Sequence, residues 1–147
     1  MRLSAKSEYA VKALLDLALH AAGDLQPIQD IAARQGIPQR YLEQVLLGLK
    51  RAGFLMSRRG SAGGYRLGRP ADQITVGAVL RAVEGTEAGD AAGRGGRRVP
   101  ADDVGDLAEL WREIDAAVSG VIDRLTLEDL KRRAEEQRRT ARPMYHI

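Results

Sequence analysis

Cysteine is absent from the 147 residues of this chain. Disulfide bonds, thiol catalysis and thiolate-held iron–sulfur or zinc sites are therefore excluded for this sequence. Aromatic residues make up only 4% of the chain, so a hydrophobic core must be built from Leu, Ile, Val and Ala. No apolar run approaches the roughly 20 residues that a membrane-spanning helix requires, and the first six residues lack the apolar centre of a signal peptide. We therefore expect a cytoplasmic protein without a membrane partner.

Charge is distributed unevenly along the chain. Residues 1–70 contain 11 Lys and Arg against 5 Asp and Glu, a net charge of +6, whereas residues 71–147 contain 12 against 15, a net charge of −3. A basic first half and a mildly acidic second half favour a nucleic-acid-binding face followed by a protein-contact module. Ordinary variation in surface charge explains the same numbers, so the charge distribution alone does not define the function.

The first predicted helix is capped by Ser4 and runs to about His20. Polar residues recur at every fourth position, at Glu8, Lys12, Asp16 and His20, and nearly everything between them is apolar. We expect a mostly buried helix that exposes one charged stripe, with Glu8–Lys12 and Lys12–Asp16 pairs along it. His20 is interpreted as a cation near a helix C-terminus rather than as a metal ligand.

Two more helices are predicted in close succession. The first begins at Pro27 and ends at Gly36, and the second begins at Pro38 and ends before Gly53. The second helix has four apolar residues at the spacing of one helical face: Leu42, Val45, Leu46 and Leu49. Two helices joined by a short turn that contains glycine are the signature of a helix-turn-helix, although many proteins that bind no DNA also contain such a pair.

A short β-hairpin is predicted next, with Arg58 and Arg59 entering a glycine-rich turn over residues 60–64. A plain hairpin turn explains these glycines, and so does close approach of their amides to a phosphate backbone. A nucleotide-binding loop is not expected, because the turn joins two strands and lacks the Gly-Lys-Ser/Thr sequence. The helix pair and the basic hairpin together predict a winged helix-turn-helix that binds double-stranded DNA.

The N-terminal turn of a recognition helix normally enters the major groove. There Gln pairs with adenine, Arg pairs with guanine, and Glu accepts a hydrogen bond from cytosine. An arginine at the tip of a wing reaches a narrow minor groove instead. The candidate base and backbone contacts are therefore Gln39, Arg40, Glu43 and Gln44 in the helix, and Arg58, Arg59 and the amides of residues 60–64 in the hairpin.

Thr75 is placed to cap a further helix that continues to Glu84 and ends at Gly85. Residues 86–103 lack apolar periodicity and are rich in Gly, Ala, Arg and Asp, which predicts a surface loop. The sequence Thr126-x-x-Asp129 predicts a capping box that begins a last helix.

Between the loop and this capping box, apolar residues recur with alternating spacings of three and four. That spacing is a heptad seam, which a single helix attached to a small domain leaves uncovered. We therefore expect the helix to pair with the same helix of a second subunit; packing back onto its own domain is the alternative. The seam residues are Val104, Leu107, Trp111, Ile114, Val118, Val121 and Leu125.

Several short motifs occur in a fixed order along the chain. They include Leu3-Ser4-x-Lys6-x-Glu8-Tyr9-Ala10, Ile37-Pro38-x-x-Tyr41-Leu42-Glu43-Gln44, Arg59-Gly60-x-x-Gly63-Gly64-Tyr65-x-Leu67 and Val83-Glu84-Gly85. Together they resemble the Rrf2 family of bacterial winged-helix regulators. The resemblance implies a homodimeric transcription factor, usually a repressor, that binds an imperfect palindrome. It also places further residues at the DNA: Ser4, Lys6, Tyr41, Gly60, Ser61, Gly63, Gly64 and Tyr65.

Many members of that family hold an iron–sulfur cluster through three cysteines in the loop before the dimerisation helix. Here that loop contains no cysteine, and the carboxylate of Glu8 without thiolates cannot hold a cluster. We therefore expect no cofactor and no metal site. The expected fold is mainly α with a small β-hairpin: a winged helix-turn-helix domain over 1–85, a flexible loop over 86–103, a dimerisation helix over 104–125, and a C-terminal helix with a charged tail over 126–147.

The expected function is that of a homodimeric, sequence-specific DNA-binding transcriptional regulator, a repressor without its own iron–sulfur cluster. It would bind a palindromic operator, with a regulatory protein as an optional further partner. The alternative is a winged-helix module for protein contact, with weak or no specific DNA binding. An enzyme is not expected, because His20 and His146 lie far apart in the sequence and no nucleophile motif or phosphate loop accompanies them.

Overall fold

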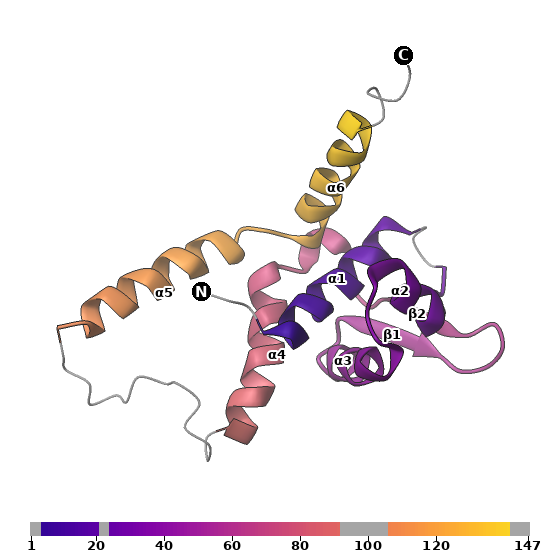
Figure 1. Cartoon of the computed structure of the whole chain (residues 1–147), viewed down its shortest axis with the longest axis horizontal. Coiled ribbons are helices and arrows are strands. Elements are labelled where there is room, and N and C mark those ends of the chain that lie inside the picture. The colour runs from indigo at the N-terminus through magenta and orange to yellow at the C-terminus, as the bar shows by residue number, and fades with distance from the viewer. Residues whose placement is uncertain (1–3, 21–23, 92–105, 142–147) are drawn as a thin grey trace.

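The computed structural model describes residues 4–20, 24–91 and 106–141. The elements in chain order are α1 (Ala5–Leu19), α2 (Ile28–Gln35), α3 (Gln39–Arg51), β1 (Leu55–Arg58), β2 (Gly64–Leu67), a 3-10 turn (Ala71–Gln73), α4 (Val76–Ala91), α5 (Ala108–Ile122) and α6 (Leu127–Ala141). Helix α1 crosses the body of the protein and contacts α2, α3, α4, α6 and β2 (Figure 1). The described part of the chain is therefore mainly α with a β-hairpin, which confirms the predicted fold class.

Helix α1 begins where the sequence predicts it. Ser4 Oγ accepts a hydrogen bond from Ser7 N at 3.1 Å, which is the expected N-cap. Both hydroxyls also donate to Glu84 Oε1, Ser4 at 3.0 Å and Ser7 at 2.6 Å, so the start of α1 is tied to α4. The predicted pair between Glu8 and Lys12 is present at 3.3 Å.

Asp16 is the exception to the predicted charged stripe. Its side chain is 1% exposed and accepts hydrogen bonds from Arg34 Nε at 3.0 Å and Arg34 Nη2 at 2.8 Å. The prediction of a Lys12–Asp16 pair on the surface is therefore wrong. The physical reason is that the arginine fork of α2 satisfies both carboxylate oxygens at once, which a lysine of the same helix cannot do.

Helices α2 and α3 form the predicted helix-turn-helix. Gly36 follows α2 with a left-handed φ of 64°, and Ile37 N donates to Ala32 O at 3.0 Å to close the helix end. The four residues of the predicted apolar stripe on α3 are each at most 2% exposed: Leu42, Val45, Leu46 and Leu49. Burying side chains of this size stabilises the fold by about 1.5–3 kcal/mol each. This burial fixes the rotation of α3 about its own axis and decides which face of the helix points outward.

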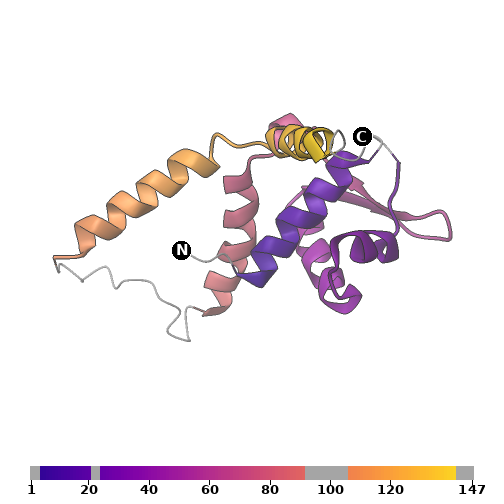
Figure 2. The ribbon, with the colours of Figure 1, turned by 45° about the horizontal axis from the view of Figure 1, so that its top comes forward.

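Strands β1 and β2 pair antiparallel, with Leu55 opposite Leu67 and Arg58 opposite Gly64. Gln26 extends this sheet by a bridge to Tyr65: its N–H donates to Tyr65 O at 2.8 Å and its carbonyl accepts from Tyr65 N at 2.9 Å. The hairpin projects from the body, and α5 projects from the opposite end (Figures 1 and 2). The segment before α2 is thus joined directly to the wing.

The caps of α4 and α6 are those predicted, but α4 is longer than expected. Ala78 N donates to Thr75 Oγ1 at 3.1 Å, and Thr126 and Asp129 exchange the two hydrogen bonds of a capping box at 3.0 and 3.1 Å. These bonds to Thr126 hold the pKa of Asp129 below its usual value. Helix α4 continues past Gly85 to residue 91. A glycine inside a helix costs only about 1 kcal/mol relative to alanine, so Gly85 does not stop it.

Helix α5 is shorter than the predicted range of 104–125. Val104 lies outside the described residues, Leu107 is the N-cap of the helix, and Leu125 belongs to the linker that follows it. Leu125 was predicted at the end of the helical seam and instead accepts a backbone hydrogen bond from Val76 N at 2.8 Å. The linker also forms a bridge between Thr126 and Thr75, just before α4, and α5 ends at residue 122.

Leu127, the first residue of α6, attaches this helix to the hydrophobic core. Its N–H donates to Ile74 O at 2.9 Å, and its side chain is fully buried in the core. Leu130 packs against the same core one turn later. The start of helix α6 therefore packs with the helix-turn-helix domain, in contact with α1.

Candidate nucleic-acid interface

The outward face of α3 carries mostly polar and basic side chains. Arg40, Gln44, Leu47 and Arg51 are all exposed, and their spacing of i, i+4, i+7 and i+11 forms a stripe opposite the buried Leu42. The predicted helix candidates are all exposed on α3: Gln39, Arg40, Tyr41, Glu43 and Gln44. The structure thus brings the proposed base-reading residues together on one accessible surface.

Leu47 belongs to this surface and was missed in the sequence. Its side chain is 46% exposed, and it lies one turn after Glu43 and Gln44. An apolar side chain at such a position can contact the methyl group of thymine in the major groove. The signal was present, because Leu47 falls outside the spacing of the buried stripe and must therefore face solvent.

Tyr41 is both exposed and fixed in place. Its ring meets that of Tyr9 edge-on, with centroids 5.4 Å apart and an interplanar angle of 80°. Edge-to-face packing of this kind is worth roughly 0.5–1.5 kcal/mol beyond simple burial. The contact holds the first turn of α3 against α1 while 46% of Tyr41 remains accessible to a ligand.

The two N-terminal candidates differ in their surroundings. Lys6 lies next to α3, where it lines a small depression together with Val45 and Gly48. The hydroxyl of Ser4 is engaged within the fold, as the cap of α1 and as a donor to Glu84. Lys6 is therefore placed beside the recognition helix, whereas the visible role of Ser4 is structural; DNA contact by either residue stays a prediction.

The predicted wing residues fall into two groups. The first group is exposed at the tip of the hairpin: Arg58, Arg59, Gly60 and Ser61. The second group is required by the fold. A Cβ on Gly63 would collide with the carbonyl of Arg58, a Cβ on Gly64 would lie 2.5 Å from Gln26 O, and Tyr65 packs against the core. The hairpin turn explains Gly63 without DNA, and contact with Gln26 explains Gly64, while Arg58 and Arg59 are exposed and accessible to DNA.

Arg69 connects the wing to the end of α3 and was not singled out in the sequence. Its Nη2 donates to Ala52 O at 3.2 Å, and its guanidinium lies 5.0 Å from the centroid of the Phe54 ring. A cation at a helix C-terminus is favoured by the helix dipole, and its contact with an aromatic face adds to this. Arg69 therefore stabilises the junction between the recognition helix and β1.

An apolar surface on α5 is the second candidate interface. No residue of α5 is buried, and four large hydrophobic side chains on it or at its N-cap are exposed: Leu107, Leu110, Trp111 and Val121. Ile114 and Val118, the other seam residues, are half-buried. The described part of the chain does not cover this surface, and Leu110 extends it beyond the predicted seam.

The base of α5 is tied to α4 by an ion pair. Arg81 Nη1 and Nη2 contact the two oxygens of Asp123 at 2.6 and 2.8 Å. The hydrogen bonds to Arg81 hold the pKa of Asp123 below its usual value, and the pKa of Arg81 is raised in turn. A Cβ on Gly77 would collide with Asp123 Oδ1, so the glycine leaves room for the pair.

The donor groups of the chain decide which metal groups it can hold. An iron–sulfur cluster needs thiolates, and the sequence contains no cysteine. Within residues 4–20, 24–91 and 106–141, no three His, Asp or Glu side chains are gathered as a metal site would need. The donor set does not fit an iron–sulfur cluster. Among the described helices, none is long and apolar enough to cross a membrane.

A helix-turn-helix with an exposed polar recognition face, joined to a basic β-wing, defines a winged-helix DNA-binding protein. Residues 3–133 match the family described as Rrf2, iron-dependent transcriptional regulator. The chain belongs to the Rrf2 family, which confirms the resemblance found in its motifs.

Two kinds of relative support this assignment. The chain is 43% identical over 133 residues to the HTH-type transcriptional regulator IscR of Photobacterium profundum, covering 90% of this chain and 76% of that protein. Its structure is similar to that of IscR from T. potens, with a TM-score of 0.77, 33% identity and coverage of 93% and 90%. It is also similar to CymR, the global cysteine regulator of B. subtilis, with a TM-score of 0.74, 34% identity and coverage of 89% and 96%.

These findings define the general function. The protein is a DNA-binding transcriptional regulator of the Rrf2 type. Its homologues and its fold are those of transcriptional regulators, so the expectation that it is not an enzyme is confirmed.

Proposed function

We propose that the protein is a homodimeric repressor that binds a palindromic operator and uses no iron–sulfur cluster of its own. The observation that carries this proposal is the accessible stripe on α3 beside the basic wing tip. Arg40 and Gln44 face outward from a helix whose opposite side is buried, and Arg59 is exposed on the adjoining hairpin. Such a pair of elements fits adjacent major and minor grooves of one duplex.

The dimer is supported by the apolar surface of α5, which the described part of the chain leaves uncovered. Trp111 is 45% exposed and Val121 is 54% exposed, although both lie on a helix with heptad spacing. Pairing with α5 of a second copy would remove these side chains from water, at about 25 cal/mol for each Å² buried. A two-fold dimer presents two identical recognition helices, and these fit two half-sites about one helical turn apart.

Each contact residue has a separate role in this proposal. Arg40 and Gln44 read base edges, and Glu43 restricts the sequences accepted because its carboxylate repels phosphates and accepts only from a base such as cytosine. Arg59 adds affinity at the minor groove and the backbone. We propose repression because a dimer bound over a promoter excludes polymerase from it.

Independence from an iron–sulfur cluster rests on ligand chemistry. The chain supplies no thiolate, so a cluster would lack the ligands that its relatives are expected to use. A signal must then reach the regulator by another route, and binding of a regulatory protein is the route we propose.

The proposal is tested by selecting bound sequences from random DNA with the purified protein, followed by affinity measurements at several salt concentrations. We expect an inverted repeat, with affinity that falls steeply as salt rises. Arg59→Ala should weaken binding by roughly 5- to 150-fold, the loss of one important arginine contact. Arg124→Ala is the matched control, because it removes the same charge from the exposed linker after α5.

Two results would contradict the proposal. Selection that enriches no sequence would exclude a specific operator. Equal effects of Arg59→Ala and Arg124→Ala would favour the alternative of a protein-contact module, in which the wing tip does not meet DNA.

A further inference from the structure

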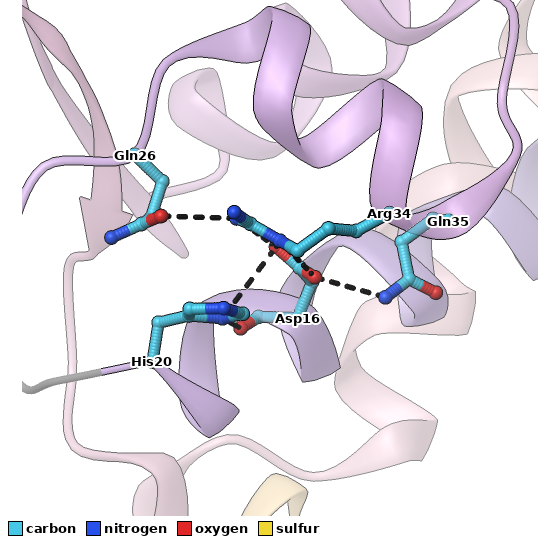
Figure 3. A network of polar contacts seen from close by, with 5 residues as sticks. All are labelled: Asp16, His20, Gln26, Arg34 and Gln35. Carbon is cyan, nitrogen blue, oxygen red and sulfur yellow. Dashed lines mark hydrogen bonds and ion pairs between the residues drawn. The ribbon is translucent and has the colours of Figure 1, made fainter.

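A network of polar side chains centred on Asp16 lies between α1, α2 and the segment before α2 (Figure 3). The two oxygens of Asp16 accept from the fork of Arg34, and Oδ1 also accepts from Gln35 Nε2 at 2.9 Å. Arg34 Nη2 donates in addition to Gln26 Oε1 at 3.0 Å. His20 Nδ1 contacts the backbone carbonyl of Asp16 at 2.6 Å, and because a carbonyl only accepts, this nitrogen carries the proton.

The buried side-chain atoms of the network all have hydrogen-bond partners. Asp16 is 1% exposed, and within the described part of the chain no buried side-chain nitrogen or oxygen lacks a hydrogen-bond partner. The hydrogen bonds to Asp16 raise the pKa of Arg34 above its already high ordinary value, so the guanidinium stays charged. A network whose buried atoms are all hydrogen-bonded holds its members in one geometry.

The network joins the two elements that the proposed function places at the DNA. Arg34 and Gln35 are the last two residues before Gly36, the turn that leads into α3. Gln26 bridges Tyr65 of β2 through two backbone hydrogen bonds at 2.8 and 2.9 Å. One carboxylate, that of Asp16, is therefore connected on one side to the start of the recognition helix and on the other side to the wing.

Stability alone is a weak explanation for such a group. Burying the Asp16 carboxylate is costly even though Arg34 keeps 32% of its side chain exposed, and a well-packed apolar residue of similar volume often gives an equal or greater stability. The ion pair adds a defined geometry. The two hydrogen bonds from the Arg34 guanidinium fix its distance and angle to the Asp16 carboxylate, which apolar packing does not do. The benefit is therefore expected where relative placement matters, at the interface with DNA.

We propose that Asp16 is a positioning residue for DNA binding, which holds the wing and the recognition helix at the separation that one duplex requires. This inference rests on the proposed function, since it assumes that α3 and the wing bind the same operator. Asp16 does not touch DNA; it acts through Arg34 and Gln26. Its loss reduces the cooperation between the two contact regions rather than either contact alone.

A double-mutant cycle tests this role. Operator affinity is measured for the full-length wild-type protein, Arg59→Ala, Asp16→Asn and the double variant, at a temperature where circular dichroism shows each to be folded. If Asp16 aligns the wing with α3, the loss of affinity caused by Arg59→Ala should be at least about threefold smaller in the Asp16→Asn background. If Asp16 only stabilises the fold, Arg59→Ala costs the same factor in both backgrounds, and that result overturns the proposal.

A second variant keeps the test decisive if Asp16→Asn unfolds. Gln26→Leu removes the side-chain acceptor of Arg34 Nη2 but keeps the backbone bridge to Tyr65. It should also reduce the effect of Arg59→Ala, by about twofold or more; an unchanged effect counts against the proposal. Glu8→Gln is the matched control, an exposed carboxylate of the same helix, and it should leave the effect of Arg59→Ala unchanged.

Failure of this inference is distinguishable from failure of the proposed function. If the wild-type protein selects no operator, the proposed function is wrong, and the proposed role of Asp16 is then wrong as well. If the wild-type protein selects an operator and Arg59→Ala weakens binding equally in all backgrounds, only the role of Asp16 is wrong.

Discussion

Replacement of Gly64 by alanine should destabilise the protein, because the fold leaves no room for a Cβ at this position. Gly64 has a φ of 154°, and an added Cβ would lie 2.5 Å from Gln26 O and 2.9 Å from Pro27 N. Backbone strain of this kind costs on the order of 1–3 kcal/mol for a residue with a side chain. The clash also displaces two backbone hydrogen bonds between Gln26 and Tyr65, worth about 0.5–1.5 kcal/mol each.

We therefore expect Gly64→Ala to lower the free energy of unfolding by at least about 2 kcal/mol. For a chain of this size that is a fall in melting temperature of roughly 4–8 °C. Urea and thermal unfolding followed by circular dichroism measure both quantities. Gly48→Ala is the control, because Gly48 lies inside α3 with nothing within 4 Å of an added Cβ, and should be neutral or stabilising by up to about 1 kcal/mol.

The result that would refute this reasoning is a Gly64→Ala protein as stable as the wild type but impaired in DNA binding. Gly64 would then be present to admit the DNA backbone, which is the other explanation that the sequence leaves open. Loss of stability together with loss of binding supports the structural explanation.

Three further substitutions test other parts of the structure. Leu127→Ala should cost about 2–5 kcal/mol in urea unfolding, because a fully buried leucine anchors α6; a cost below about 1 kcal/mol would place α6 outside the core. Trp111→Glu should shift the protein from dimer to monomer in sedimentation velocity without changing its circular dichroism, and an unchanged dimer would exclude the α5 surface as the interface. Asp123→Asn should destabilise at neutral pH and have no effect in acid. Arg81 lowers the folded-state pKa of Asp123, so the ion pair contributes stability above the unfolded-state pKa and loses it as pH falls through the lowered value. A difference that persists in strong acid would contradict this assignment.

The helix-turn-helix could be predicted from the sequence because its signals are local. The buried stripe of α3 follows from the spacing of Leu42, Val45, Leu46 and Leu49, and Gly36 marks the turn before it. The same spacing identifies the outward face, including Arg40 and Gln44. The caps of α1, α4 and α6 were predictable for the same reason, since a cap and its partner lie three residues apart.

The errors arose where distant parts of the chain decide the structure. Asp16 fits the spacing of a solvent-exposed stripe, but its carboxylate is buried because it accepts hydrogen bonds from Arg34, eighteen residues away. Leu125 fits a heptad seam, but its carbonyl pairs with Val76, and α5 ends before it. The sequence leaves two explanations open for Gly64, a plain hairpin turn and close approach to DNA, and it does not reveal that Gln26 leaves no room for a Cβ there. Periodicity describes one element at a time and carries no information on such partners.

The central claim is that two copies, joined through α5, present two α3–wing pairs to one duplex. The most direct measurement is the mass of the complex with a selected operator, by sedimentation equilibrium or native mass spectrometry. We predict two protein chains on each duplex, and a Trp111→Glu protein that no longer forms this complex at the same concentration. A saturated complex with a single chain on each operator would contradict the account.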